Sequence, residues 1–152
     1  MCARGLIDAG VNGSGNGNHK VSVLLVDNDR AFLQIASTLL ETHYPDDVEI
    51  VGVASSGEEC LVKAQQLAPE VVLMDLQMPG MGGLRTIPIL RLQFPNTRVI
   101  ALTFDDGERA RRAVLAAGGS DLVSKSTLKA DLIPAIQRAI GRSGAQPGAV
   151  AT

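Results

Sequence analysis

Asp75 is the residue of this sequence that is best placed to do chemistry. An uninterrupted apolar run, Val71–Met74, leads directly to it, and a turn rich in glycine and proline follows at once. Such a run is typical of a β-strand that is buried on both faces, with Asp75 at its carboxyl end. In open parallel sheets that end is where chemistry takes place. The alternative is a surface aspartate that merely ends the strand.

Polar side chains also follow three other short apolar runs. They are Asp27, Asn28 and Asp29 after the run 21–26, Thr103 at the end of the run 97–103, and Lys125 after the run 121–124. Because the carboxyl ends of parallel strands meet at one edge of a sheet, these groups are expected to lie close together. Crowded carboxylates raise each other's pKa unless a cation lies between them. Mg²⁺, which prefers oxygen ligands and keeps several waters, is the natural candidate.

A magnesium ion, a lysine and a hydroxyl together form a site that suits a phosphoryl group. The metal contacts phosphoryl oxygens, Lys125 offsets negative charge, and the Thr103 hydroxyl donates a hydrogen bond. A carboxylate beside these groups can act as a nucleophile and form an acyl phosphate. The sequence therefore predicts phosphoryl chemistry centred on Asp75.

The elements that would position these groups alternate between strand and helix. Strands are expected at 21–26, 48–54, 70–75, 97–103 and 121–124, and helices between 29 and 45, at 56–67, 83–94 and 105–117, and before 141. This alternation predicts an α/β fold of the doubly wound, flavodoxin-like type. Its five-stranded parallel sheet would have five helices on both faces and right-handed crossovers. Ser56, followed three residues later by Glu59, predicts a capping box at the second helix.

Two prolines predict irregular helices. Pro88 lies inside the third expected helix, where proline removes a backbone hydrogen bond, so we expect a kink or a late start. Pro134 is tolerable in the last helix only if that helix begins near Asp131. The inner face of the first helix is expected to comprise Phe32, Ile35, Ala36, Leu39 and Leu40.

Length and composition are those of one globular domain. The chain has 152 residues, of which 45% are apolar and 20% charged, and its formal net charge is −2. This length allows a proper core, and the lack of basic excess argues against direct nucleic-acid binding. The segment 1–19 is rich in glycine and asparagine, so we expect it to be disordered, followed by a domain at 20–142 and a flexible tail at 143–152.

The sequence also favours a cytoplasmic location. Its two cysteines, Cys2 and Cys60, lie far apart, and Cys60 falls within a helical pattern, so a disulfide framework is not expected. No apolar run approaches the roughly 20 residues that span a bilayer. The N-terminus lacks the charged start and apolar block of a signal peptide.

Four segments, in this order, resemble the receiver domains of two-component response regulators. They are Leu24–Asp27, Val71–Met81, Ile100–Thr103 and Leu122–Lys125, and the resemblance extends from Lys20 to Arg142. It implies that Asp75 accepts a phosphoryl group from a sensor histidine kinase. It also implies that Mg²⁺ is held by Asp27, Asn28, Asp75 and the backbone carbonyl of Gln77. Thr103 and Lys125 are implied to contact the phosphoryl group.

The resemblance further implies a switch and not a turnover enzyme, although the domain could remove its own phosphoryl group. The face formed by 105–117, 121–124 and the last helix is implied to change its partner preference and to mediate a homodimer. The segment Ala116–Gly118 and the pair Lys125–Ser126 resemble receivers that are joined to helix-turn-helix DNA-binding domains. The receiver itself is expected to contact neither nucleic acid nor membrane.

Three residues depart from the family's pattern. Asn28 stands where the second acid usually ligates the metal, so we expect weaker metal binding unless Asp29 compensates. Leu122 stands where many relatives have an aromatic residue that swings inward. Phe104 follows Thr103, where relatives commonly have alanine or serine, and its bulk is expected to narrow access to the site.

Two other functions stay open at this point. Asn28 and Phe104 also fit a receiver-like interaction module that is not phosphorylated. A metal-dependent phosphatase with an aspartyl nucleophile commonly has a second acid two residues later, where this sequence has Gln77. Arg109, Arg111 and Arg112 form either a solvated helix face or a surface for a partner.

Overall fold

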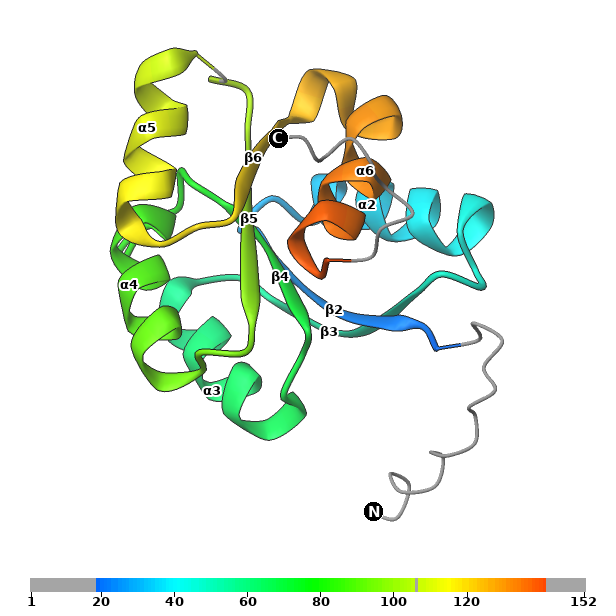
Figure 1. Cartoon of the computed structure of the whole chain (residues 1–152), viewed down its shortest axis with the longest axis horizontal. Helices are drawn as coiled ribbons and strands as arrows, with labels where there is room; N and C mark the ends of the chain where they lie inside the picture. The colour runs from blue at the N-terminus through cyan, green and yellow to red at the C-terminus, as the bar shows by residue number, and fades with distance from the viewer. Residues whose placement is uncertain (1–18, 106, 142–152) are drawn as a thin grey trace.

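A parallel five-stranded sheet forms the centre of the fold (Figure 1). The computed structural model describes residues 19–105 and 107–141. The strands are β2 (Val21–Val26), β3 (Val48–Ala54), β4 (Val71–Asp75), β5 (Arg98–Thr103) and β6 (Asp121–Ser124). Their order is β3-β2-β4-β5-β6 and every neighbouring pair is parallel, which confirms the predicted fold class.

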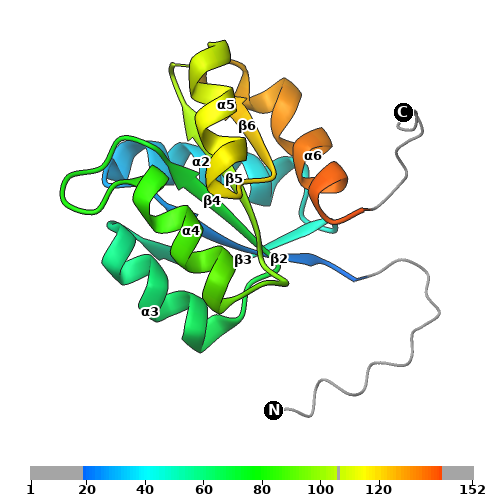
Figure 2. The same ribbon diagram turned by 60° about the vertical axis from the view of Figure 1, so that its left-hand side comes forward.

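Helices cover both faces of this sheet (Figure 2). One face is covered by α2 (Arg30–His43) and α6 (Leu128–Ala139). The 3₁₀ turn η1 (Lys125–Thr127) comes directly before α6. The other face is covered by α3 (Gly57–Leu67), α4 (Gly83–Gln93) and α5 (Glu108–Ala117). Successive strand residues point to opposite faces, so each face has its own core. Leu25 and Leu73 are buried in one core, and Leu24 and Val72 in the other.

The pairing of the strands brings the candidate residues to one place. β4 lies between β2 and β5, and all five of its residues are buried. Val26 pairs with Met74, and Asp75 pairs with Leu102. Asp27 and Thr103, each one residue further along its strand direction, therefore flank Asp75 on its two sides.

The start of α3 differs from the capping box that the sequence predicts. The Ser56 hydroxyl accepts a hydrogen bond from the N–H of Glu59 at 3.0 Å, as expected for an N-cap. The Glu59 carboxylate, however, accepts from the N–H of Ser55 at 2.8 Å, one residue before the predicted donor. The reciprocal half of the box is thus made with the preceding residue.

The prediction of a late start for the last helix is wrong. α6 begins at Leu128, three residues before Asp131, although Pro134 lies inside it. Pro88 likewise lies inside α4, which begins at Gly83. Each proline removes the hydrogen bond to the carbonyl four residues earlier, and the residues that bear those carbonyls, Leu84 and Ala130, are exposed. Both helices nevertheless continue past their proline.

One residue of the predicted inner face of α2 is exposed. Phe32, Ala36 and Leu40 are buried at intervals of four residues, whereas Ile35 is 60% exposed. Ile35 lies roughly 100° around the helix from Ala36, at the margin of the buried stripe. The sequence spacing alone predicted that Ile35 is buried, because residues three positions apart can also share one face of a helix.

The predicted terminal segments lie outside the described residues, with the exception of His19. Its Nε2 atom lies 3.0 Å from Oε1 of Glu70, just before β4. The predicted limits of the domain at 20 and 142 therefore stay predictions. Cys60 is buried, and burial raises its pKa to about 12, while Cys2 lies outside the described part. Within residues 19–105 and 107–141, none of the helices has the length and apolar character required to cross a membrane.

Asp121 connects α5 and α6 to the start of β6. Its Oδ1 atom accepts a hydrogen bond from Arg111 at 3.0 Å, and Oδ2 accepts one from Arg138 at 2.6 Å. Burial by itself raises the pKa of Asp121. The hydrogen bonds from Arg138, from the N–H of Leu122 and from Arg111 outweigh burial, so the pKa lies below its ordinary value.

Asp121→Asn is expected to lower the free energy of unfolding at neutral pH by about 1.5 kcal/mol, the usual contribution of hydrogen bonds to a charged group. Because folding lowers the pKa of Asp121, its contribution is fully present above the unfolded value of about 3.9. It is lost as the pH falls through the lower folded value. Urea denaturation of both proteins at a series of pH values measures the difference, which should shrink at the acid end.

The control for this experiment is Glu108→Gln. Glu108 pairs with Arg112 at 3.4 Å on the exposed surface of α5, and such pairs contribute little to stability. Its substitution should leave the unfolding midpoint almost unchanged at every pH. Equal effects of the two substitutions would contradict the assignment of Asp121 as the connecting residue.

Candidate functional site

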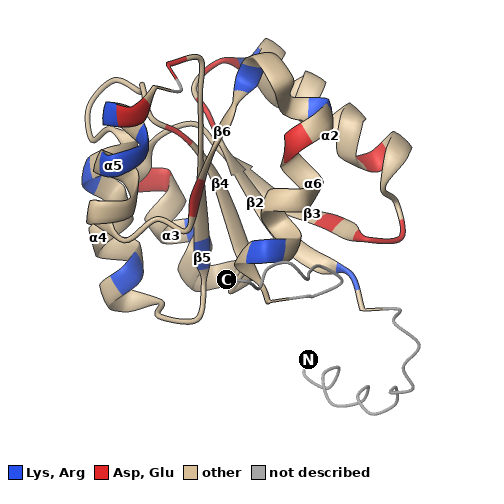
Figure 3. Cartoon of the chain, turned by 45° about the horizontal axis from the view of Figure 1, so that its top comes forward, with Lys and Arg blue, Asp and Glu red and all other residues tan. Residues whose placement is uncertain are grey.

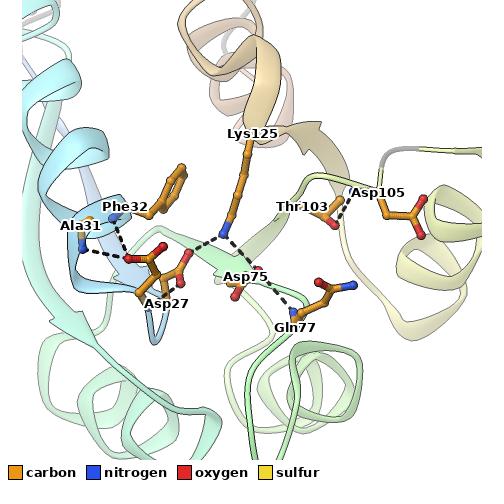
Figure 4. Close-up of polar contacts among 9 residues, drawn as sticks. Asp27, Ala31, Phe32, Asp75, Gln77, Thr103, Asp105 and Lys125 are labelled. Carbon is orange, nitrogen blue, oxygen red and sulfur yellow. Dashed lines mark hydrogen bonds and ion pairs between the residues drawn. The ribbon is translucent and has the colours of Figure 1, made fainter.

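The predicted site residues meet at the carboxyl edge of the sheet (Figure 4). Asp27 follows β2, Asp75 ends β4, Thr103 ends β5, and Lys125 begins η1 directly after β6. The first three are nearly inaccessible, with 1%, 5% and 2% of their surfaces exposed, and the Lys125 side chain is 7% exposed. The edge therefore holds two carboxylates, a hydroxyl and an ammonium group in a largely buried cluster.

Lys125 lies between the two carboxylates. Its Nζ atom is 2.7 Å from Oδ2 of Asp27 and 3.3 Å from Oδ1 of Asp75. The sequence predicted that Lys125 would face a phosphoryl group, but not that it would contact Asp27 more closely than Asp75. Ion pairs between residues so distant in sequence leave no periodic signal, and only the sheet order places them together.

The electrostatics of Asp75 are unfavourable to its charged form. Burial is the largest cause that raises its pKa, and the neighbouring charge of Asp27 raises it further. The N–H of Gln77, which donates to Oδ1 at 3.3 Å, and the Lys125 ammonium lower the pKa but do not offset the increase. The pKa of Asp75 is therefore raised overall, even with a lysine between the two carboxylates.

The two residues after Asp27 have different surroundings. Oδ1 of Asp29 accepts hydrogen bonds from the N–H groups of Ala31 at 3.0 Å and Phe32 at 3.3 Å, so Asp29 is the N-cap of α2. Asn28 is exposed, and its side chain makes no hydrogen bond to any residue in the described part. Oδ1 of Asp29 therefore serves as the helix cap, and compensation for Asn28 by this carboxylate stays a prediction.

The donor set still fits a magnesium ion. The described residues contain no group of three acidic, histidine or cysteine side chains that could hold a metal. Asp27 and Asp75, however, supply two carboxylates, and the Asn28 amide and the Gln77 carbonyl are oxygen donors in the adjoining turns. Burial and then the charge of Asp27 raise the pKa of Asp75 despite its contact with Lys125. A second, hard cation that binds oxygen would stabilise this pair.

Thr103 lies on the other side of Asp75. Its hydroxyl oxygen accepts a hydrogen bond from the N–H of Asp105 at 3.0 Å. This contact fixes the start of the loop that leads to α5, and no described residue accepts a hydrogen bond from the Thr103 hydroxyl. The position agrees with the predicted hydrogen bond to a phosphoryl oxygen, which stays a prediction.

Two aromatic rings lie near Lys125. The sequence named Phe104 as a residue that narrows access to the site, which stays a prediction, but it did not predict Phe32 as part of the site. The centre of the Phe32 ring is 4.2 Å from Nζ, and that of the Phe104 ring is 5.6 Å away. Phe32 is 9% exposed and Phe104 is 71% exposed. The available signal for Phe32 was its place in the first helical turn after Asp27, but its apolar spacing suggested only a core residue.

The remaining candidates lie around α5. Leu122 is buried under the α3, α4 and α5 face, and its carbonyl accepts a hydrogen bond from Arg111 at 3.3 Å. The arginines of α5 form the blue region of that helix in Figure 3. Arg109 and Arg112 are exposed, whereas Arg111 is half-buried against β6. Arg109 and Arg112 are therefore accessible to solvent or to a partner, and the choice between these two interpretations stays open, whereas Arg111 is held against β6.

Relatives with the same sequence pattern are response regulators. The model of the response regulator receiver domain matches residues 23–137. The response regulator GacA of Pseudomonas syringae pv. syringae (strain B728a) is 35% identical over 117 residues, which are 77% of this chain and 54% of that protein. The response regulator protein VraR of Staphylococcus aureus is 33% identical over 119 residues, 78% of this chain and 56% of that protein. The chain thus spans about half the length of these relatives.

Solved structures with the same fold also include response regulators and their receiver domains. A LuxR-family two-component response regulator from Aurantimonas sp. SI85-9A1 has a TM-score of 0.75 and 26% identity, over 81% of this chain and 86% of that one. The receiver domain of the response regulator NarL from Mycobacterium tuberculosis has a TM-score of 0.74 and 25% identity, over 81% and 98%. Asp27, Asp75, Thr103 and Lys125 all fall within the matched residues. The chain therefore belongs to the family of response regulator receiver domains and is such a domain of a two-component system.

Proposed function

We propose that Asp75 accepts a phosphoryl group from a sensor histidine kinase in the presence of Mg²⁺. The observation that supports this most directly is the position of Asp75 at the tip of the buried central strand, 3.3 Å from Lys125 and next to Thr103. An oxygen of Asp75 attacks the phosphorus, the bond from phosphorus to the donor histidine nitrogen breaks, and that nitrogen keeps the electron pair. The product is an acyl phosphate on Asp75.

Lys125 and Thr103 are placed to stabilise that product. The Lys125 ammonium already contacts Asp75, so only a small shift of Nζ is needed to reach a phosphoryl oxygen. The Thr103 hydroxyl can donate to a second oxygen. Because both groups lie in a largely buried cluster, their interactions with the added charge are stronger than they would be in water.

Asp27, Asp75, the Gln77 carbonyl and the Asn28 amide are the groups that would hold Mg²⁺. The ion would offset negative charge on the phosphoryl oxygens as they approach Asp75. An amide oxygen has no net charge, so Asn28 contributes less to cation binding than a carboxylate would. The proposed site is therefore of lower affinity than one with two acids after β2.

Phosphorylation would act on the face formed by α5, β6 and α6. Thr103 leads into α5, Lys125 leads into α6, and Asp121 connects both helices to β6. Movement of Thr103 and Lys125 toward the phosphoryl group would change this face and its preference for a partner, including a second copy of the chain. The domain would function in the cytoplasm as a switch and not as a turnover enzyme, and it would make no direct contact with DNA.

Intact-mass measurement after incubation with a small phosphodonor tests the proposal. The wild-type protein should gain one phosphoryl group with Mg²⁺ and almost none with a chelator. A protein that gains no phosphoryl group under any condition would support the receiver-like interaction module instead. Sustained release of phosphate from an ester substrate would point to the phosphatase.

Asn28→Asp is expected to increase the affinity for Mg²⁺ by about tenfold, which corresponds to 1.4 kcal/mol. The added carboxylate supplies a charged oxygen ligand next to Asp27, where the present residue supplies an amide. Isothermal titration calorimetry of the unphosphorylated protein measures the affinity. The faster phosphoryl uptake at limiting Mg²⁺ that should accompany it can be followed by intact mass.

The matched control is Asn96→Asp. Asn96 is exposed in the loop before β5, at the opposite edge of the sheet. The substitution Asn96→Asp therefore adds the same negative charge far from the site. Its effect on Mg²⁺ affinity should be small and should vanish at high ionic strength. If Asn28→Asp and Asn96→Asp change the affinity equally, Asn28 is not near the bound metal.

A further inference from the structure

We propose that Phe32 is a positioning residue that holds the Lys125 ammonium at the phosphorylation site through a cation–π contact. This inference rests on the proposed function of Asp75, because Lys125 is the group that meets the phosphoryl oxygens. The supporting observation is the distance of 4.2 Å between Nζ and the centre of the Phe32 ring. A cation within about 6 Å of a ring centre is attracted by the negative face of the ring.

The surroundings of Nζ make this contact effective. The ammonium contacts Asp27 at 2.7 Å and Asp75 at 3.3 Å, and the Lys125 side chain is only 7% exposed. Figure 4 shows the Phe32 ring beside the end of the lysine side chain, next to these carboxylates. A cation–π contact is strongest where water is excluded, because water otherwise weakens the attraction.

The backbone around Phe32 holds the ring in place. Its N–H donates to the carboxylate of Asp29, the N-cap of α2, and the N–H of Asp29 donates to Oδ1 of Asp27 at 2.8 Å. The ring itself is 9% exposed and packs in the core under α2 and α6. Asp27, the helix cap and Phe32 thus form one connected unit that contacts Lys125 through both the Asp27 carboxylate and the Phe32 ring.

Phe104 does not have the same support. It is 71% exposed and its ring centre lies 5.6 Å from Nζ, near the outer limit of an effective contact. The structure therefore assigns the positioning role to Phe32. When Nζ shifts from Asp27 toward a phosphoryl oxygen on Asp75, the ring remains in contact with the ammonium and keeps water away from it.

The test must separate the electrostatic role of the ring from its packing role, because Phe32 is also a core residue. Phe32 is replaced site-specifically by successively more heavily fluorinated phenylalanines, which weaken the negative ring face while they preserve the shape of the ring. The initial rate of phosphoryl uptake from a small phosphodonor with Mg²⁺ should fall progressively. The most heavily fluorinated ring should reduce it by roughly three- to tenfold.

Phe94 provides the matched control. It lies at the end of α4, packs against the core on the other face of the sheet, and contacts neither Asp75 nor Lys125 in the described part of the chain. The same fluorinated residues at position 94 should leave the rate unchanged. A fall of similar size at both positions would show that fluorine acts through packing, which would overturn the inference.

A second measurement does not depend on phosphorylation. Fluorination at Phe32 should lower the urea midpoint of the wild-type protein but not that of Lys125→Met, because the coupling disappears when the cation is absent. An unchanged midpoint in the wild type, or the same loss in both proteins, overturns the positioning role. If the wild-type protein takes up no phosphoryl group, the proposed function itself fails, whereas normal uptake with no response to fluorination rejects Phe32 alone.

Discussion

Asp75→Asn is expected to abolish phosphoryl uptake while the fold stays intact. The variant keeps the size and shape of the side chain at the end of β4 but replaces the nucleophilic carboxylate oxygens with an amide. Asp27 is the other carboxylate of the cluster, but Lys125 contacts it at 2.7 Å, and it follows the neighbouring strand β2. We therefore expect a loss of at least two orders of magnitude in the initial rate, since covalent catalysis requires the nucleophile itself.

Intact mass after incubation with a small phosphodonor and Mg²⁺ measures this loss. The matched control is Asp105→Asn, which removes an exposed carboxylate at the same edge of the sheet and should be phosphorylated like the wild type. An adduct of equal size on Asp75→Asn would show that another residue accepts the phosphoryl group. Loss of the adduct in both variants would instead indicate that the general charge of the edge controls uptake.

Asp75→Asn should also stabilise the protein. Burial and the charge of Asp27 raise the pKa of Asp75, so the folded state disfavours the carboxylate that is ionised at neutral pH. Removal of that charge should raise the free energy of unfolding by about 1 kcal/mol, the usual scale of single-substitution effects. Urea denaturation in the presence of a chelator would measure it. Active sites commonly keep residues that lower the stability of the protein, because the reaction requires them.

The sheet and the edge that holds the candidate site could be predicted because the sequence patterns that indicate them are local. Val71–Met74 is an unbroken apolar run, as expected for a central parallel strand, and it leads to a single carboxylate. The other strands are apolar and β-branched in the same way, and each ends within one residue of its expected place. Given parallel strands, the position of Asp27, Asp75, Thr103 and Lys125 at one edge follows from the topology alone.

The contacts within the site could not be predicted because they depend on distances between residues far apart in the chain. Asn28 and Asp29 are both good N-caps by type, and only the structure shows that Asp29 takes this role. Phe32 has the spacing of a core residue, which it is, but its ring also faces a charged group. The error at Pro134 has a different cause: a general rule on proline did not include the exposure of Ala130, the residue whose carbonyl loses its partner.

Lys125→Met is expected to destabilise the unphosphorylated protein more than any other single substitution at the site. It would leave Asp27 and Asp75, which are 1% and 5% exposed, next to each other without the cation that now lies between them. Removal of one partner from a buried ion pair costs about 3–5 kcal/mol, because the remaining charge is neither solvated nor compensated. Methionine keeps the length of the side chain, so the loss should come from charge and not from volume. Urea denaturation in a chelator measures it, with Lys129→Met, an exposed lysine of α6, as the control.

Two further measurements identify repulsion between the carboxylates as the cause. Asp27→Asn combined with Lys125→Met should recover much of the lost stability, because only one buried charge then remains. Mg²⁺ should raise the urea midpoint of Lys125→Met more than that of the wild type, since a ligand that binds only the folded state stabilises it and the variant has more uncompensated charge to offset. If Lys125→Met is no less stable than Lys129→Met, the ammonium does not compensate these carboxylates in solution. If it is less stable but neither Asp27→Asn nor Mg²⁺ restores it, the loss comes from the cation–π contact with Phe32 and not from repulsion between the carboxylates.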